Sequence, residues 1–319
     1  MEFAFITDPL ESLKIEKDST YAMMREAAAR GHRIHALQQE DLVWRAGGVT
    51  GRTQRLHLLD GSAAWYRAET PQTRPLAEFD AVLMRKDPPF DMEYVYSTYL
   101  LEFAQNQGAR VFNDPRAIRD HNEKMSIAYF SQFAPPTLVT RRIELIHDFL
   151  AEHSDIILKP LDGMGGISVF RVQRDDPNLN VIIETVTHYG RRTVMAQRFI
   201  AEVSAGDKRV LLIGGEPVPY SLARIPRPGE TRGNLAAGAI GIARELTARD
   251  REIAAAVGPP LAAQGLLLVG LDVIGDWLTE VNVTSPTCFR EITDQTGFSV
   301  AGMMLDALEN AVQHPYIKP

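Results

Sequence analysis

The first residues that could do chemistry lie in a short glycine-rich run, which begins at Lys159. The run contains Gly163, Gly165 and Gly166, and strand-like residues flank it on both sides. Closely spaced glycines allow backbone N–H groups to approach an anion, and the lysine adds a positive charge suited to phosphate. The run is neither a Walker A loop nor a dinucleotide-binding fingerprint, because no Gly-Lys-Ser/Thr follows and the next predicted element is a strand. Taken alone, the run is equally compatible with a phosphate site and with a tight hairpin that carries an incidental lysine.

A second candidate site combines two carboxylates and an amide. Asp272 lies in an apolar stretch typical of a buried strand, and Glu280 and Asn282 follow in the next predicted strand. Residues two apart in a strand point to the same face, so these two side chains present their oxygens together. Oxygen ligands from adjacent strands suit Mg²⁺, or Mn²⁺, with phosphate and water completing the shell. Solvated polar residues are the alternative, although an unpaired Asp272 among apolar neighbours would be costly.

Basic residues form a third group of candidates. Asp207-Lys208-Arg209 opens a predicted strand, and the glycine-rich stretch from 224 to 244 contains Arg232. A mobile lid over this stretch could bring Arg232 to a transferring phosphoryl group and exclude water. Arg85 follows another predicted strand, in a position that suits a substrate carboxylate. A solvated loop and a solvated strand end are the alternatives.

Strands and helices alternate in the part of the chain that precedes these candidates. We expect strands over 3–7, 33–37 and 79–84, helices from Asp18 or Ser19 to Arg30 and over 94–107, and a hairpin-like insertion over 43–59. This alternation predicts an open parallel sheet with ligands beyond the carboxyl ends of its strands.

The remaining chain predicts a mostly antiparallel pattern. After a helix over 122–130, strands are expected over 156–159, 167–172, 194–199, 208–213, 216–222, 268–273 and 277–281, with a helix over 247–264. The fold class is therefore α/β, and 319 residues suggest two or three packed units.

Composition excludes several classes of protein. A net charge of -7 argues against a nucleic-acid-binding or anionic-membrane surface, and the most apolar stretch, 266–274, is too short to span a membrane. The acidic Glu2 is unlike a signal peptide, and the single Cys288 allows no intrachain disulfide, so we expect a cytoplasmic protein. Cys288 has no histidine placed to activate it, and the eight histidines form no zinc pattern; His32, His35 and His121 are expected in surface or loop positions.

The order of the motifs resembles that of the ATP-grasp ligases. The matching residues are Lys124, Lys159 with its glycine run, 197–200, 207–209, Asp272, and Glu280 with Asn282. Within this superfamily, stretches 84–90, 155–166, 231–238 and 283–288 are similar to bacterial glutathione synthetases, and the likeness covers essentially the whole chain.

The resemblance implies a three-part ATP-grasp architecture. It comprises an N-terminal parallel-sheet (pre-ATP-grasp) domain over 1–121, a small central lid domain over 122–199, and a C-terminal antiparallel-sheet domain over 200–319. The last domain would carry a flexible loop at about 225–242. ATP would lie between the central and C-terminal domains.

The resemblance also implies roles for individual residues. The ATP contacts would be Lys124, Lys159, Gly163, Met164, Gly165, Gly166, Gln197, Arg198, Phe199, Ile200, Asp207, Lys208, Arg209 and Asn282. The catalytic residues would be Lys159, Arg209 and Arg232. The acceptor substrate would contact Asp18, Arg85, Ser285, Pro286 and Arg290. Mg²⁺, or Mn²⁺, would bind Asp272, Glu280 and Asn282.

The reaction implied by this family is the ATP-dependent joining of gamma-glutamylcysteine and glycine. Glutathione, ADP and phosphate would form through an acyl phosphate, and the resemblance implies a homo-oligomer, a tetramer. Two alternatives are another carboxylate–amine ligase of the same fold and a nucleotide-binding regulatory protein without catalysis.

Overall fold

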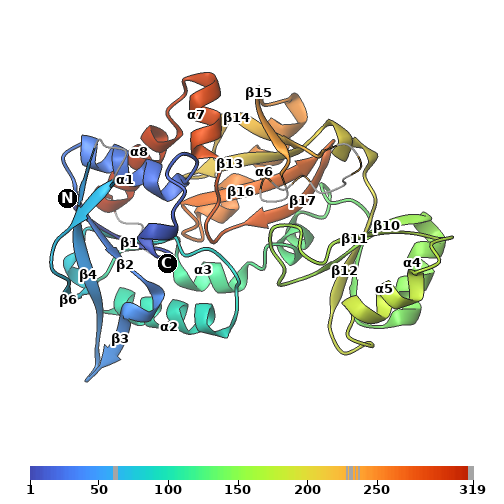
Figure 1. Ribbon diagram of the computed structural model, residues 1–319, viewed down its shortest axis with the longest axis horizontal. Helices are drawn as coiled ribbons and strands as arrows, with labels where there is room; N and C mark the ends of the chain where they lie inside the picture. Colours follow the sequence, from blue (N-terminus) through green and yellow to red (C-terminus); the bar gives the residue numbers. More distant parts are fainter. Residues whose placement is uncertain (60–63, 228, 230–232, 234, 236–237, 315–319) are drawn as a thin grey trace.

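The chain forms three sheets, which follow one another along the sequence (Figure 1). They are seen in a computed structural model that describes residues 1–59, 64–227, 229, 233, 235 and 238–314. In the described part of the chain, no helix has the length and apolar character needed to cross a membrane.

The first sheet is mixed and contains eight strands, with the path β3-β4-β2-β1-β7-β8 and with β5 and β6 both paired to β4. Strands β2, β1, β7 and β8 are parallel, as predicted, whereas β4 joins the sheet antiparallel to β2. The elements of this part are β1 (Glu2–Ile6), α1 (Ser19–Ala29), β2 (Arg33–Leu37), β3 (Leu42–Arg45), β4 (Gly48–Leu58), β5 (Tyr66–Ala68), β6 (Gln72–Pro75), β7 (Ala81–Met84), α2 (Met92–Asn106), β8 (Val111–Phe112) and α3 (Pro115–Asp120).

Helix α1 begins and ends where the sequence predicts. The carboxylate of Asp18 accepts a 2.6 Å hydrogen bond from the backbone N–H of Tyr21, which otherwise has no partner within the helix. Gly31 follows the last turn with a φ of 80°, a conformation that glycine adopts without strain.

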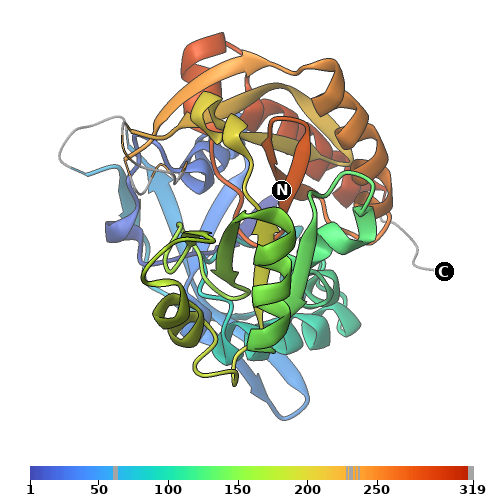
Figure 2. The ribbon, with the colours of Figure 1, turned by 90° about the vertical axis from the view of Figure 1, so that its right-hand side faces the viewer.

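The second sheet is antiparallel, in the order β11-β10-β12-β9. Its elements are β9 (Thr137–Thr140), α4 (Ile143–His153), β10 (Asp155–Pro160), β11 (Phe170–Gln173), α5 (Leu179–Val186) and β12 (Val194–Arg198). Helices α4 and α5 pack on the sheet, and buried side chains such as Ile146, Leu158 and Ile183 form a core confined to this unit. Figure 2 views the molecule with this unit in front.

The third sheet is also antiparallel, in the order β15-β14-β13-β16-β17. Its elements are β13 (Asp207–Ile213), β14 (Glu216–Ile225), β15 (Ile240–Glu245), α6 (Ala248–Ala262), β16 (Leu268–Ile274), β17 (Trp277–Asn282), α7 (Phe289–Thr296) and α8 (Val300–Gln313). The antiparallel pattern predicted for this half is therefore confirmed, and α6 continues through Pro259 and Pro260.

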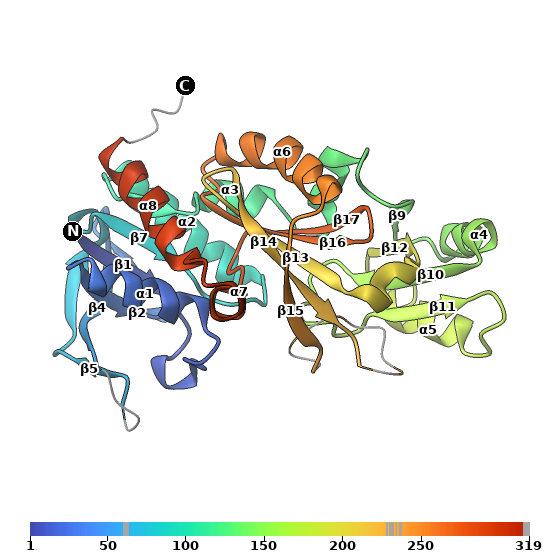
Figure 3. The same ribbon diagram turned by 90° about the horizontal axis from the view of Figure 1, so that it is seen from above.

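The first and third sheets share their hydrophobic cores. Phe3 and Phe5 of β1 belong to the same buried cluster as Leu211 of β13 and Phe289 of α7. Figure 3 shows α1 beside α7 and α8, and Arg30 at the end of α1 pairs with Asp306 of α8 at 2.7 Å. The second sheet, by contrast, has a core of its own.

Several predicted elements differ from the observed ones. The helix expected over 122–130 is only a 3-10 helix, Met125–Phe130, while the preceding residues expected in a loop form α3, which Asp114 caps. Strand β11 starts at Phe170 rather than at 167, because Ser168 has a φ of 58° and breaks the extended backbone.

Three further expectations are corrected. The loop expected over 225–242 ends earlier, because Ile240 pairs with Ile225 and begins β15. His35 is buried in β2 rather than in a surface or loop position, whereas His121 follows the end of α3, outside any helix or strand, but is buried. The His35 ring packs edge-on against Phe79, and His121 Nδ1 lies 2.8 Å from a backbone carbonyl oxygen.

Candidate active site

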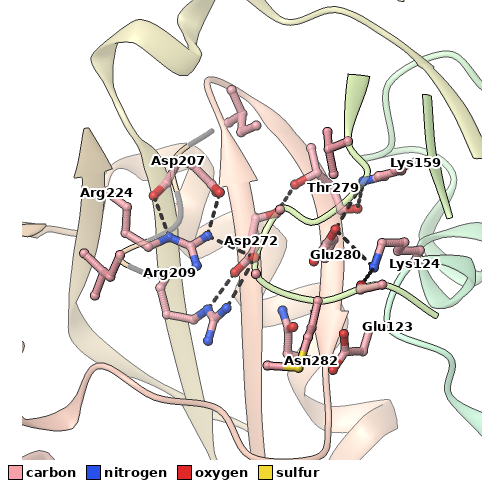
Figure 4. Close-up of a pocket in the computed structure, with 18 of the residues that line it drawn as sticks. Glu123, Lys124, Lys159, Asp207, Arg209, Arg224, Asp272, Thr279, Glu280 and Asn282 are labelled. Atoms are coloured by element: carbon pink, nitrogen blue, oxygen red, sulfur yellow. Dashed lines mark hydrogen bonds and ion pairs between the residues drawn. The ribbon is translucent and has the colours of Figure 1, made fainter. Parts of the chain in front are cut away.

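A cavity of about 350 Å³ lies where the second and third sheets face each other, and residues beyond β7 of the first sheet close one side of it. The central unit contributes Lys159, the glycine run and residues 197–200. The third sheet contributes the acidic and basic residues of β13, β14, β16 and β17 (Figure 4). The structure therefore brings the glycine run and the predicted metal ligands, which the sequence separates by more than 100 positions, into one cavity.

The glycine run forms one wall of this cavity. Lys159 lies near the end of β10, and the chain turns back toward β11 through Gly165 and Gly166, whose φ values are 63° and 79°. A carbonyl of the run, that of Gly163, accepts a 2.6 Å hydrogen bond from Lys124 Nζ. The run is thus a hairpin, and it also lines a charged cavity, so the hairpin does not exclude the predicted phosphate site.

Two lysines and Glu280 form the end of the cavity nearest the glycine run, which we call the lysine end. Lys159 Nζ lies 3.3 Å from Glu280 Oε1, and Lys124 Nζ lies 3.8 Å from the same oxygen. Burial alone would raise the pKa of Glu280, but the two lysines outweigh it and leave the pKa below its ordinary value. Burial and the neighbouring Lys124 lower the pKa of Lys159. Two cations converge here on one carboxylate.

The opposite end, which we call the guanidinium end, holds two arginines around Asp272. Arg209 Nε donates to Asp272 Oδ1 at 2.6 Å, and Arg224 Nη2 forms ion pairs with Asp272 and Asp207 at 2.9 and 2.7 Å. Burial would raise the pKa of Asp272, but the two guanidinium groups lower it far below its ordinary value. For Asp207, burial dominates and raises the pKa to about 6. Asp272 is the fixed anion of this end.

Strand register places these charges opposite one another. Asp207 faces Arg224 across β13 and β14, Arg209 faces Asp272 across β13 and β16, and Asp272 faces Glu280 across β16 and β17. A one-residue slip in any pairing would turn a charged side chain away from the cavity. The register of the third sheet is therefore what assembles the site.

The predicted metal ligands lie together on β16 and β17. Asn282 donates its amide nitrogen to the carbonyl of Gly270 at 3.1 Å, which leaves the amide oxygen available as a ligand. Asp272 and Glu280 are cross-strand neighbours, although each is held by cations. Within the described residues no group of three or more His, Cys, Asp or Glu side chains is placed to hold a metal ion. Two carboxylates and an amide fit Mg²⁺ when phosphate oxygens complete its shell.

Residues 197–200 cross from β12 toward the third sheet and line the cavity. Gln197 is buried and donates to Thr137 at 3.1 Å. Nearby, Asp207 Oδ1 is buried and has no hydrogen-bond partner among the described residues. An acceptor left in this way is costly, so it favours a ligand that brings a donor.

The residues assigned to the acceptor substrate divide into two groups. Ser285 and Pro286 line the cavity, and Ser285 donates to Asp87 at 2.5 Å. Arg85 is buried just behind them and donates to the carbonyl of Pro286 at 2.9 Å, while its Nη1 has no partner. Asp18 does not line the cavity, and it caps α1 instead.

Two other predicted contacts lie away from the cavity. Arg290 donates to the carbonyl of Ile15 at 3.0 Å, and Lys208 forms an ion pair with the buried Asp250 of α6. Lys208 alternates with Asp207 and Arg209 along β13, so its side chain points to the opposite face of the sheet. Arg232, predicted to act on the phosphoryl group, lies outside the described residues, as does most of the stretch around it.

Sequence reasoning missed two charged residues of the cavity. Arg224 was read only as the start of a loop, and its role appears once β14 is seen to continue to Ile225. Glu123 precedes Lys124 and lines the cavity, where Thr284 donates to it at 3.2 Å. Burial raises the pKa of Glu123, and Glu280 adds to the effect. Its position beside Lys124 in a Glu-Lys pair was the only available signal.

Comparisons with known proteins identify the family of this chain. The family model described as "Prokaryotic glutathione synthetase, N-terminal domain" matches residues 1–119, and "Prokaryotic glutathione synthetase, ATP-grasp domain" matches residues 123–297. The chain is 64% identical over 315 residues to "Glutathione synthetase" of Nitrosomonas europaea, covering 98% of both chains. It is 61% identical to that of Ralstonia nicotianae, covering 98% of this chain and 96% of the relative.

Solved structures share the fold at low sequence identity. D-cycloserine synthetase DcsG superposes with a TM-score of 0.68 at 17% identity, over 98% of this chain and 100% of that one. The ATP-grasp ligase PsnB superposes with a TM-score of 0.61 at 18% identity, over 98% of both chains. These likenesses confirm the predicted α/β ATP-grasp fold, and the family models and close relatives confirm the predicted resemblance. The chain belongs to the prokaryotic glutathione synthetase family.

Proposed function

We propose that this protein joins gamma-glutamylcysteine to glycine, using ATP, to form glutathione, ADP and phosphate. The observation that supports this most directly is the convergence of Lys124, Lys159 and the glycine run on Asp272 and Glu280 in one cavity. Cationic side chains opposite paired carboxylates suit a nucleotide triphosphate with its metal ion. The close relatives are named glutathione synthetase, which supports glutathione as the product, and the two substrates are those that the family resemblance implies.

ATP would lie between the second and third sheets, with its phosphates at the lysine end. Lys124, Lys159 and the N–H groups of Gly165 and Gly166 are the donors available there. The orphaned Asp207 Oδ1 suits a ribose hydroxyl, and the backbone of 197–200 suits the adenine edge. Met164 would cover the nucleotide from the glycine run. Of the residues predicted to contact ATP, Lys208 is the one for which we propose a structural role instead, because it is paired with Asp250.

Asp272, Glu280 and Asn282 would hold Mg²⁺ or Mn²⁺. When bound, the ion would neutralise phosphate charge and polarise the phosphoryl group that is transferred. Glu280 would then exchange its present lysine contacts, at 3.3 and 3.8 Å, for the ion.

In the first step, the glycine-facing carboxylate of gamma-glutamylcysteine would attack the γ-phosphorus of ATP and release ADP. The glycine amine would then attack the acyl phosphate, so that a C–N bond forms and phosphate leaves with the oxygen it received. Arg209 lies at the guanidinium end, where it would stabilise negative charge on the tetrahedral intermediate, and Arg232 would act from the lid. Arg85, Ser285 and Pro286 would position the peptide.

The proposal also includes the domain boundaries, the oligomeric state and the location of the protein. Domains over 1–121, 122–199 and 200–319 are supported by the sheets, each of which falls within one of these ranges. A homo-oligomer is supported by an exposed apolar stripe on α2, formed by Met92, Tyr96, Tyr99 and Phe103 at helical spacing. The single cysteine supports a reducing, cytoplasmic location.

The test offers the purified protein ATP, Mg²⁺, gamma-glutamylcysteine and glycine, and measures phosphate release together with the mass of the product. We expect phosphate release only when both substrates are present, and a product with the mass of glutathione. Phosphate release with other carboxylate–amine pairs, and none with this pair, would favour a different ligase of the same fold. Nucleotide binding without phosphate release in any mixture would favour the regulatory alternative.

A further inference from the structure

A second, smaller cavity of about 180 Å³ lies on the first sheet. Glu2, Arg33, His35, Arg55, Glu69 and Arg74 are among its lining residues, and the rest are threonine and glutamine. Among the described residues, none lines both this cavity and the catalytic one. The strands that carry the lining, β1, β2, β4 and β6, lie together at the left of Figure 1, beside the label N.

Strand register explains how these side chains gather. Glu2 is the partner of Arg33, His35 is the partner of Arg55, and Thr53 is the partner of Gln72. Paired residues share a face of the sheet, so all of these side chains point the same way. Farther along β1 and β2 the same face is apolar, with Ile6 and Leu37 packed in the core that includes residues of α2. The polar hollow therefore begins where the apolar core ends.

The hollow lies at the amino ends of β1 and β2, whereas the catalytic cavity takes Asp87 and Pro88 from beyond the carboxyl end of β7. The two cavities thus lie at opposite edges of one parallel set of strands. A ligand in the hollow would not compete with ATP.

The lining of the hollow is rich in guanidinium groups. Arg74 donates to Glu2 at 2.8 Å and to Glu78, outside the lining, at 3.0 Å, and it stacks on Phe79 at 4.4 Å, so its guanidinium group is fixed. Arg33 also pairs with Glu2, and Arg55 lies 3.7 Å from Glu69. The donors left for a ligand therefore belong to Arg33 and Arg55. Because each guanidinium has five N–H donors, Arg33 and Arg55, whose side chains are 55% and 40% exposed, retain donors for a ligand.

His35 supplies an independent observation. This residue is 6% exposed, and its buried Nε2 has no hydrogen-bond partner in the part of the chain that the structure describes, although Glu2 Oε2 lies 3.4 Å away. Burial, together with Arg74, Arg55 and Arg33, lowers the pKa of His35 to about 4 against the opposing effect of Glu2. The ring is therefore neutral at pH 7. A buried polar atom that lines a cavity and lacks a partner calls for a ligand there.

We propose that this hollow is a binding site for a small tetrahedral oxyanion of the phosphate or sulfate type. The guanidinium forks of Arg33 and Arg55 bind two of its oxygens, and Nε2–H of His35 donates to a third. The entirely polar lining excludes an apolar ligand, and the free guanidinium donors of Arg33 and Arg55 select an anion. The lining of the hollow contains no residue of the proposed ATP site, so this proposal does not rest on the proposed ligase reaction.

The test titrates inorganic phosphate into protein whose histidines carry ¹³C, at pH 7 and constant ionic strength, with a nonhydrolysable ATP analogue and Mg²⁺ saturating the catalytic cavity. The His35 ring resonance is assigned by its loss in His35→Gln. We expect a saturable shift of this resonance, because a bound anion raises the pKa of the ring while Glu2, Glu69 and the three arginines stay in place. Sulfate should give the same shift and succinate a weaker one.

The double variant Arg33→Gln/Arg55→Gln should weaken phosphate binding at least tenfold. Both side chains are partly exposed, so the fold should survive, which circular dichroism checks. The matched control is Arg52→Gln. Arg52 is exposed and lies on β4, the strand that carries Arg55, but its side chain points to the other face of the sheet. Absence of saturation in the wild type, equal affinity in the double variant, or tighter binding of succinate than of phosphate would overturn the assignment.

Discussion

The lysine end and the guanidinium end of the catalytic cavity hold their charges in different ways. At the guanidinium end, Asp272 lies 2.6 Å from Arg209 and 2.9 Å from Arg224, and all three side chains are buried. At the lysine end, the carboxylate of Glu280 lies 3.3 and 3.8 Å from two lysines. The first set is closed on itself, whereas the second has long contacts that a ligand can replace. The guanidinium end serves as a preformed frame, which would present Asp272 to the metal ion without rearrangement, and the lysine end as a receiving site, where Glu280 would exchange its contacts.

Asp272→Asn should have the largest effect, and it should act on stability. The change leaves two buried guanidinium groups with one fewer anion, which costs about 3–5 kcal/mol of unfolding free energy. Urea unfolding measures the loss. Asp306→Asn is the matched control, because it also removes an arginine partner but its side chain is 73% exposed and should change stability by about 1 kcal/mol or less. Equal losses of unfolding free energy in the two variants would show that Asp272 stabilises the fold no more than an exposed carboxylate does.

Glu280→Gln should act on turnover more than on stability. The amide cannot supply the negative charge proposed for the metal ion, so turnover should fall roughly 100-fold or more. The fold should stay intact, and the loss of unfolding free energy should be smaller than in Asp272→Asn, because the lysine contacts of Glu280 are longer. Steady-state phosphate release and a urea titration measure the two quantities. Glu245→Gln on exposed β15 is the control and should leave both unchanged. Full activity in Glu280→Gln would exclude Glu280 from the metal site.

The residues of the guanidinium end were harder to predict from the sequence than those of the lysine end. Lys159 and the Glu280–Asn282 pair could be predicted because local spacing marks a glycine turn and a common strand face. Arg224 could not, because its contacts depend on the register of β13 with β14, where a bulge between Val210 and Leu212 shifts the pairing. Short, half-exposed strands such as β9 also lack the apolar runs that identify buried ones.

Asp207→Asn should change how the unfolding free energy depends on pH. Asp207 pairs with Arg224 of the guanidinium end. Since burial raises the pKa of Asp207 from 3.8 to about 6, the folded state binds its proton more tightly than the unfolded chain does. This stabilisation is complete below about pH 4 and is lost as pH rises through 6, and the asparagine variant lacks it. The stability of the wild type relative to the variant should therefore fall by about 2 kcal/mol between pH 4 and pH 7. Urea titrations at several pH values measure it, and a constant difference would contradict the shift.

Lys159→Met should have the smallest effect of the four, on nucleotide binding. Methionine fills similar space but offers no charge to phosphate, so ATP affinity should fall about tenfold. Lys208→Met tests the contrast, since Lys208 pairs with Asp250 and not with the cavity. It should lower stability and leave ATP affinity unchanged, as measured by calorimetric titration. A comparable loss of ATP affinity in both variants would indicate that Lys208 contacts the nucleotide after all.

The most direct measurement of the proposed reaction follows oxygen. Gamma-glutamylcysteine labelled with ¹⁸O in both oxygens of its glycine-facing carboxylate is incubated with the protein, ATP, Mg²⁺ and glycine, and the masses of phosphate and product are determined. If the carboxylate attacks the γ-phosphorus before glycine attacks the acyl phosphate, phosphate gains one ¹⁸O and glutathione keeps the other. Unlabelled phosphate, or product formed without phosphate release, would contradict the proposed reaction.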